Sequence, residues 1–191
     1  MHLKNGPIGI FDSGVGGLSV LRVLADAFPN EDFIYLGDTA RLPYGTKSLS
    51  TIRNYVEQNV RFLVTQGVRM VVIACHSASA TALEEREFEG IPLFNVIEPA
   101  IKTALQISEH QCIGLIATNT TVNSKSYDTL LHKLAPQTNL YMQAAPLLVS
   151  LVEEGWIDDP HVEPGIISHR LEHEQCGRVD RVCENHDAGH S

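Results

Sequence analysis

Short apolar runs alternate along this chain with longer segments in which apolar residues recur at helical spacing. Such runs are typical of buried strands, and the spaced segments are typical of helices. The predicted strands cover residues 8–11, 33–36, 70–74, 93–96, 112–117 and 140–143. The predicted helices cover residues 18–28, 52–63, 77–88, 99–108, 121–134 and 146–154.

The regular alternation of strand and helix predicts an α/β fold. Several strands are uninterrupted apolar runs, which indicates a parallel sheet flanked by helices on both faces. In such sheets, ligands bind beyond the carboxyl ends of the strands. We therefore expect four loops to converge on one crevice: Asp12-Ser13, Pro43-Tyr44-Gly45, Cys75-His76-Ser77 and Thr118-Asn119-Thr120-Thr121.

Cys75 is the candidate with the clearest chemistry. It ends the apolar run 71–74, and the small and hydroxyl residues that follow can open a helix. A helix N-terminus favours a thiolate over a thiol, and a thiolate is both a base and a nucleophile. The alternative is a buried structural cysteine, since free Cys is among the most buried residue types.

The other three loops carry candidate ligand-binding groups, each with a structural alternative. Asp12 is a strong acceptor at a strand end, or else a helix N-cap. The loop holding Pro43-Tyr44-Gly45 is too long for a simple connection, although Pro-x-Gly also suits a surface turn. Thr118 and Thr121 lie where a strand meets a helix, where capping is an equally good role. The glycine-rich segment 12–17 lacks the G-x-G-x-x-G order and a Walker lysine, so no nucleotide site is expected.

Composition narrows the classes of partner and compartment. The 191 residues carry a formal net charge of −9, which argues against binding to nucleic acid or to an anionic membrane surface. No apolar run approaches transmembrane length, and the first residues lack the apolar core of a signal peptide, so a cytoplasmic protein is expected. Four cysteines are too few for a disulfide scaffold, so reduced thiols are expected.

The character of the chain changes after about residue 159. Residues 160–191 form a polar tail with five of the nine histidines and two of the four cysteines, and no strand-helix pair is predicted there. Histidines recur four residues apart at His169 and His173, and again at His186 and His190. The order of these ligands matches no common zinc motif, so no metal site is predicted.

Five segments together resemble the glutamate racemases, which belong to the cofactor-independent aspartate/glutamate racemase superfamily. Their order and spacing across residues 8 to about 156 fit that family, and a match of five ordered motifs is highly specific. The segments are Ile8-Gly9-Ile10-Phe11-Asp12-Ser13-Gly14-Val15-Gly16-Gly17-Leu18, residues 37–47 (Gly-Asp-Thr-Ala-Arg-Leu-Pro-Tyr-Gly-Thr-Lys), Ala74-Cys75-His76-Ser77-Ala78-Ser79-Ala80, Val96-Ile97-Glu98-Pro99, and residues 146–155 (Pro-Leu-Leu-Val-Ser-Leu-Val-Glu-Glu-Gly).

The resemblance implies two α/β domains and a reaction. Residues 1–97 would form the first domain, 98–159 the start of an incomplete second, and 160–191 a divergent tail. The activity implied is interconversion of L- and D-glutamate by two cysteines that move a proton, with no cofactor, which supplies D-glutamate for peptidoglycan. The family implies a small-molecule substrate and often a homodimer.

Roles follow from the resemblance residue by residue. Cys75 matches the first catalytic cysteine, Asp12 the carboxylate beside it, and Glu153 a residue that supports the second thiol. The substrate-binding positions implied are Asp12, Ser13, Pro43, Tyr44, Gly45, His76, Ser77, Thr118 and Thr121.

The chain also departs from the family pattern. His76 stands where the family has Asn, and Ser77 replaces Thr but keeps the hydroxyl. The family's second catalytic cysteine lies in a Gly-Cys-Thr-His segment after an apolar strand, and no such segment is present. Cys183 stands about the right distance from Cys75, without the flanking Gly and Thr. The alternatives are therefore a module that binds an acidic amino acid without turnover, and a one-cysteine decarboxylase or isomerase of the same superfamily.

Overall fold

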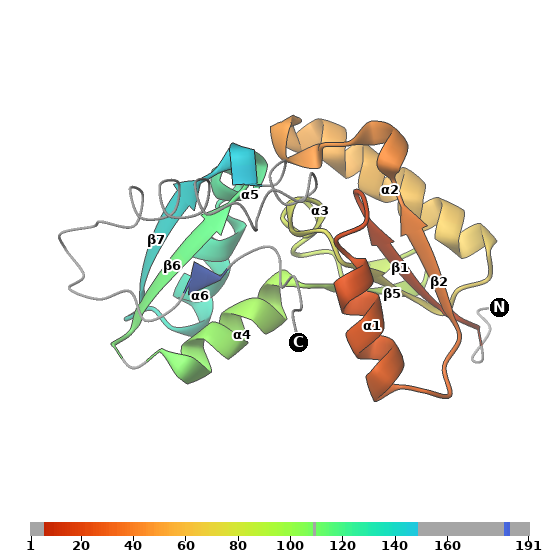
Figure 1. Ribbon diagram of the computed structural model, residues 1–191, viewed down its shortest axis with the longest axis horizontal. Helices are drawn as coiled ribbons and strands as arrows, with labels where there is room; N and C mark the ends of the chain where they lie inside the picture. The colour runs from red at the N-terminus through yellow and green to blue at the C-terminus, as the bar shows by residue number, and fades with distance from the viewer. Residues whose placement is uncertain (1–5, 109, 149–181, 184–191) are drawn as a thin grey trace, which may run out of the picture.

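The computed structural model describes residues 6–108, 110–148 and 182–183, and these form two α/β units side by side (Figure 1). The first unit contains a five-stranded sheet in the order β2-β1-β3-β5-β4. Its strands are β1 (Ile8–Asp12), β2 (Phe33–Gly37), β3 (Met70–Ile73), β4 (Glu87–Phe88) and β5 (Ile91–Asn95). All pairings are parallel except that of β4 with β5. The α/β prediction with a parallel sheet is thus confirmed, with β4 as the one antiparallel strand among the described residues of this sheet.

Helices cover both faces of the first sheet. The helices of this unit are α1 (Leu18–Ala27), α2 (Leu49–Thr65), α3 (His76–Ser79) and the short 3-10 helices η1 (Thr39–Arg41) and η2 (Tyr44–Thr46). The predicted apolar stripe of α2 packs on Phe11, Val71 and Ile73 of the sheet. Ser48 caps α2, its hydroxyl accepting from the Thr51 N–H at 3.1 Å. Because Gly67 takes a positive φ of 77° just beyond the helix end, it serves as the predicted stop.

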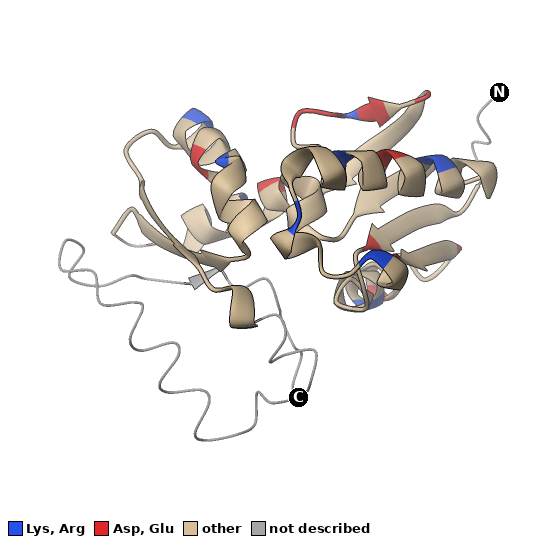
Figure 2. Ribbon diagram, turned by 90° about the horizontal axis from the view of Figure 1, so that it is seen from above, with Lys and Arg blue, Asp and Glu red and all other residues tan. Residues whose placement is uncertain are grey.

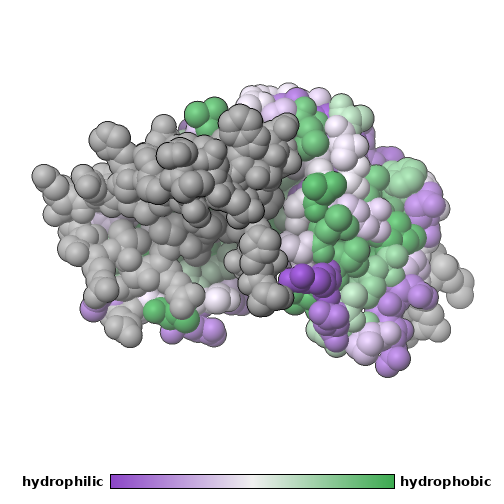
Figure 3. Space-filling view, in the orientation of Figure 1, coloured by the Kyte–Doolittle hydropathy of each residue, from purple (hydrophilic) through white to green (hydrophobic). Residues whose placement is uncertain are grey.

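The opposite face of the first sheet is covered less completely. Helix α1 packs on Ile8 and Ile10 through partly buried residues, and none of its own residues is fully buried. Val23 of this helix is 63% exposed. Figure 3 shows apolar residues gathered over the first unit, on the side where α1 lies.

The predicted helix over residues 77–88 is wrong. The helix ends at Ser79, whose hydroxyl donates to the Ile73 carbonyl at 2.9 Å, and β4 and β5 then form a hairpin. Glu89 and Gly90 make its turn with φ of 49° and 80°, the geometry of a two-residue hairpin loop. Ion pairs from Arg53 and Arg61 tie the hairpin and the segment before it to α2, along which acidic and basic positions mix (Figure 2).

The second unit contains a three-stranded parallel sheet in the order β7-β6-β8. Its strands are β6 (Cys112–Ala117), β7 (Asn139–Ala144) and β8 (Val182–Cys183), and its helices are α4 (Ile97–Ile107), α5 (Asn119–Ser124) and α6 (Ser126–Leu134). The predicted helix 121–134 is two helices, because Lys125 takes the left-handed conformation with φ of 59° and breaks the run. Within the tail, where no strand-helix pair was predicted, the short strand β8 pairs with the central strand β6.

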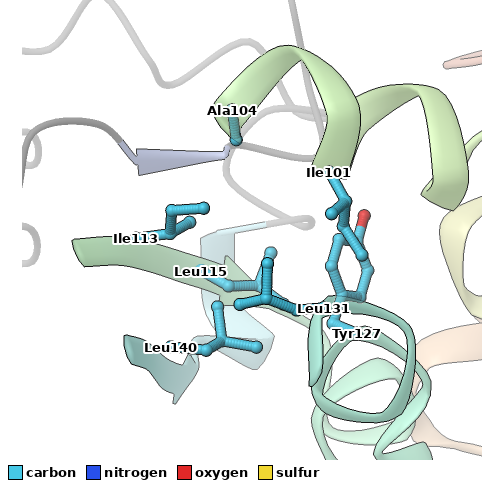
Figure 4. A pocket seen from close by; sticks show the side chains of 7 residues that line it. All are labelled: Ile101, Ala104, Ile113, Leu115, Tyr127, Leu131 and Leu140. Carbon is cyan, nitrogen blue, oxygen red and sulfur yellow. The ribbon is translucent and has the colours of Figure 1, made fainter. Parts of the chain in front are cut away.

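The core of the second unit encloses an apolar cavity (Figure 4). Side chains from α4, β6, α6 and β7 line it: Ile101, Ala104, Ile113, Leu115, Tyr127, Leu131 and Leu140. Cys112, at the start of β6, is disulfide-bonded. The expectation that the thiols are all reduced is therefore wrong, because pairing depends on which sulfurs the fold brings together and not on how many the sequence holds.

Candidate active site

The four loops predicted to converge are in contact in the structure. The Cys75 thiol lies 3.5 Å from the hydroxyl of Ser13, and the Ser77 hydroxyl lies 2.9 Å from that of Thr118. Gly45 packs against Thr118 so closely that a Cβ added to it would stand 2.6 Å from the threonine Cβ. Strands β1, β3 and β6 therefore deliver their carboxyl-terminal loops, and the 43–46 loop, to one place between the two units.

Cys75 lies at the end of β3, where it precedes α3 as the N-cap residue. It is a free thiol and buried, and the side chain donates a hydrogen bond to Ser13. Burial and the nearby Asp12 carboxylate raise the pKa of Cys75 from 9.0 to about 11, against a smaller lowering by the hydrogen bonds of the sulfur with the Ser13 side chain and with the backbone of Ala78 and Ser13. The site thus holds the thiol in its protonated form at neutral pH.

The expectation that a helix terminus makes Cys75 a thiolate is therefore wrong for the ligand-free protein. Helix α3 has only four residues, so few peptide dipoles add to its terminus. Desolvation of the sulfur and the charge of Asp12 outweigh that small favourable effect. A positive group entering the site would shift the balance back toward the thiolate.

Asp12 does not take the structural role that was its alternative. The N-cap residue of α1 is Gly17, and no side chain caps that helix. The Asp12 carboxylate is buried and accepts from the Gly14 N–H at 2.8 Å. Tyr35 donates its hydroxyl to the Gly14 carbonyl at 3.0 Å, and burial together with Asp12 and Cys75 raises the pKa of this tyrosine. The carboxylate therefore stays beside the Cys75 thiol.

Three hydroxyl groups meet in the site. Ser77, Thr118 and Thr121 are all buried, and their side-chain oxygens lie 2.9 Å, 3.0 Å and 3.4 Å apart. Thr118 also caps α5 by accepting from the Thr121 N–H at 3.2 Å, so its capping role is real. Each hydroxyl can rotate to donate or to accept a hydrogen bond. The three together could therefore bind either a carboxylate or an ammonium group.

The loop containing Pro43, Tyr44 and Gly45 enters the site by its backbone. The Leu42–Pro43 peptide bond is cis. The Tyr44 ring is buried, and its hydroxyl donates to Asp38 and accepts from the Asn59 side chain at 3.0 Å. That hydroxyl is consequently engaged away from the other site residues, and the pKa of Tyr44 is raised by burial and by Asp38.

Sequence reasoning missed Asp38, Arg41 and Asn59, which surround the Tyr44 hydroxyl. Arg41 contacts Asp38 at 2.7 Å, and Asn59 donates to Asp38 at 3.2 Å. One signal was available, because Asn59 is a polar residue within the apolar stripe of α2. A buried polar side chain needs hydrogen-bond partners, so Asn59 indicated that other polar residues pack against α2.

The remaining candidates lie at the edge of the site or outside the described residues. His76 begins α3, and its ring is stacked with that of Tyr127 at 6.3 Å between centroids. Cys183 ends β8 and pairs with Leu115 of β6, two residues before that strand ends. Glu153 and the predicted helix end near residue 154 lie outside the described residues.

Two features are absent from the residues that the structure describes. No helix within them is long and apolar enough to cross a membrane. Across residues 6–108, 110–148 and 182–183, His, Cys, Asp and Glu side chains form no group of three or more that could hold a metal ion.

The chain thus consists of parallel α/β units that meet at a buried thiol, a carboxylate and a hydroxyl cluster. The family model of Asp/Glu/hydantoin racemases matches residues 8–155. The chain belongs to this Asp/Glu/hydantoin racemase family.

Within the family the similarity is to glutamate racemases. The glutamate racemase of Neisseria meningitidis is 50% identical over 154 residues, which are 80% of this chain and 57% of that protein. The glutamate racemase of Aquifex aeolicus is 46% identical over 177 residues, or 92% of this chain and 68% of its relative. The crystal structure of the Francisella tularensis glutamate racemase with D-glutamate matches with a TM-score of 0.80 and 38% identity, covering 89% of this chain and 65% of that one. The chain thus spans less than two thirds of the length of most of these relatives.

Proposed function

We propose that this protein is a glutamate racemase that interconverts L- and D-glutamate by proton transfer at cysteine, and so supplies D-glutamate for peptidoglycan. The observation that carries the proposal is the buried Cys75 thiol, which lies near Asp12 and Ser13 in the site that also holds the cluster of three hydroxyls. Among the relatives, the crystal structure of the Francisella tularensis glutamate racemase in complex with D-glutamate supports the proposal.

The proposed first step uses the raised pKa of Cys75. The α-hydrogen of glutamate is weakly acidic, so a strong base is needed to remove it. A thiol with a pKa near 11 gives a stronger base, once ionised, than an ordinary thiol does. The ammonium group of bound glutamate would favour the thiolate by its positive charge, so the base would form when substrate arrives.

We propose that different residues bind the carboxylate and the ammonium group of glutamate. Ser77, Thr118 and Thr121 would bind the α-carboxylate together with the backbone of Tyr44 and Gly45. Ser13 and Asp12 lie on the Cys75 side, where Asp12 would relay a proton or attract the ammonium. His76 and Pro43 would shape the outer part of the site.

Inversion needs a second acid or base on the other face of the α-carbon. We assign it to Cys183, because β8 ends at this residue beside β6, the strand that leads into Thr118. Glu153 is proposed to support that thiol. A homodimer stays a prediction, which light scattering tests.

Deuterium exchange tests the proposal directly. The protein is incubated with L-glutamate in deuterated water, and we expect deuterium at the α-carbon together with D-glutamate. Cys75→Ser should abolish exchange from one enantiomer most strongly, and Cys183→Ser from the other. Wild-type protein that gives neither deuterium nor D-glutamate would refute turnover.

A second candidate function is binding of glutamate without turnover. The observation that favours it is the sequence around Cys183, which lacks the flanking Gly and Thr of the family's second catalytic cysteine. Calorimetry separates the two functions. Heat of binding with glutamate but no deuterium exchange supports the binding module, and the absence of heat with both glutamate and aspartate counts against it.

A further inference from the structure

Four polar residues form a connected network behind the 43–46 loop, on the side away from Cys75. Asp38 accepts from Arg41 and from Asn59, and the Tyr44 hydroxyl donates to Asp38. Asp38, Tyr44 and Asn59 are all buried, with exposed fractions of 8%, 1% and 4%. Buried polar groups of this kind hold a unique geometry only when each finds its partners.

Arg41 ties the network to helix α2. Its guanidinium donates to the side chains of Asn59 and Gln58, both at 2.7 Å, and lies 4.4 Å from the centre of the Tyr55 ring. These three partners belong to one helix, α2. A planar guanidinium with several fixed donors restricts the orientation of whatever it binds. Asn59 donates both to Asp38, which follows β2, and to the Tyr44 hydroxyl in the 43–46 loop, so α2 holds the chain before the loop as well as the loop itself.

The other side of the loop is held by the second unit. The Thr120 hydroxyl donates to the Lys47 carbonyl at 2.9 Å, and Gly45 packs on Thr118. The same Thr118 contributes to the hydroxyl cluster of the site. A displacement of the loop would therefore move the hydroxyl cluster relative to Cys75.

We propose that Asp38, Arg41 and Asn59 are positioning residues that set the affinity of the site by fixing the Tyr44 and Gly45 backbone. None of the three touches the hydroxyl cluster or the thiol in the hydrogen bonds of the described residues. The inference rests on the proposed function, because it takes the ligand to be an amino acid whose carboxylate meets this loop. It assigns Tyr44 a role through its buried hydroxyl, as the anchor of the backbone and not as a direct ligand of the substrate.

The test compares Asn59→Leu with Asn54→Leu in the full chain. Both changes replace asparagine by leucine on α2, but Asn59 is buried in the network and Asn54 is exposed. We expect Asn59→Leu to weaken D-glutamate binding by about tenfold or more in calorimetry, as the loss of buried hydrogen bonds predicts. Asn54→Leu should leave the affinity unchanged. Tyr44→Phe, which keeps the ring and removes only the hydroxyl, should weaken binding in the same direction.

A second measurement does not depend on binding. The amide signal of Gly45 in a proton–nitrogen correlation spectrum should shift in Asn59→Leu and Tyr44→Phe and stay in place in Asn54→Leu. Unchanged affinity with an unchanged Gly45 signal in Asn59→Leu, in a variant that still unfolds cooperatively, would overturn the inference. If wild-type protein binds no glutamate, the proposed function fails, and the Gly45 signal alone still decides whether the network positions the loop.

Discussion

The Cys75 thiol donates a hydrogen bond to the Ser13 hydroxyl, 3.5 Å away, and so joins the end of β3 to the loop that follows β1. The two residues are 62 positions apart in the sequence. They meet because β1 and β3 are parallel neighbours, so that their carboxyl ends lie at the same edge of the sheet. This contact places the thiol next to Asp12, and the proximity governs the first prediction.

Replacing Asp12 with Asn should make Cys75 more reactive toward alkylation. The carboxylate raises the pKa of the thiol, so removing its charge lowers that pKa and increases the fraction of thiolate at pH 8.5. We expect the iodoacetamide rate at Cys75 to rise about threefold or more, since each unit of pKa changes the thiolate fraction tenfold. Mass spectrometry of the peptide follows the modification. Asp26→Asn, on the exposed side of α1, is the control, and equal rates in the two variants would contradict the electrostatic argument.

The buried thiol also predicts a dependence of stability on pH. Because the folded protein raises the pKa of Cys75 from 9.0 to about 11, its native state holds the proton more tightly than the unfolded state does. The stabilisation is full below pH 9 and is lost as the pH rises through 11. Urea unfolding of wild type and Cys75→Ala at pH 8 and pH 10.5 checks this. We expect wild type to lose more stability between the two values, and identical losses would rule the effect out.

Gly45→Ala should be destabilising and should weaken glutamate binding. The new Cβ would stand 2.6 Å from both Cβ and Cγ2 of Thr118, closer than real contacts allow. Overpacking of this kind costs about 1–3 kcal/mol. Thr118→Ser removes Cγ2 but keeps the hydroxyl, so it should recover part of the loss in a double-mutant cycle. Strict additivity of the two changes in urea unfolding would show that the contact does not matter.

Ala104→Leu should destabilise the protein, because the apolar cavity of the second unit is small. Ala104 lies on α4 and lines the apolar space between α4, β6 and α6 (Figure 4). The cavity has a volume of about 10 Å³, whereas leucine adds three carbon atoms to alanine, and overpacking of this kind costs about 1–3 kcal/mol. Ala100→Leu, one turn earlier on the same helix and outside the cavity lining, is the matched control. Thermal unfolding compares the two, and a midpoint for Ala104→Leu at or above that of wild type would contradict the prediction.

Much of the fold was predictable from local pattern. The apolar runs at β1 in the first unit and β6 in the second both proved to be strands that are buried along their whole length, each with a parallel neighbour on either side. The stripe of α2 and the stop at Gly67 were also readable, because helical spacing and a glycine beyond the helix end are local signals. The hairpin of β4 and β5 was not readable, since the pattern of the β4 segment suits a helix and this segment becomes a strand only by pairing with β5.

The site, like the fold, was predictable in one part and not in another. The apolar runs show which residues follow the ends of strands, and a parallel sheet necessarily brings those ends together, so Cys75, Ser77 and Thr118 could be grouped in advance. The environment of each group depends on the packing of the whole fold. Burial and Asp12 raise the pKa of Cys75 where the local helix terminus suggested the opposite, because desolvation depends on everything packed around the sulfur. The Tyr44 hydroxyl likewise pairs with Asp38 and Asn59, contacts that form only when helix α2 packs behind the loop.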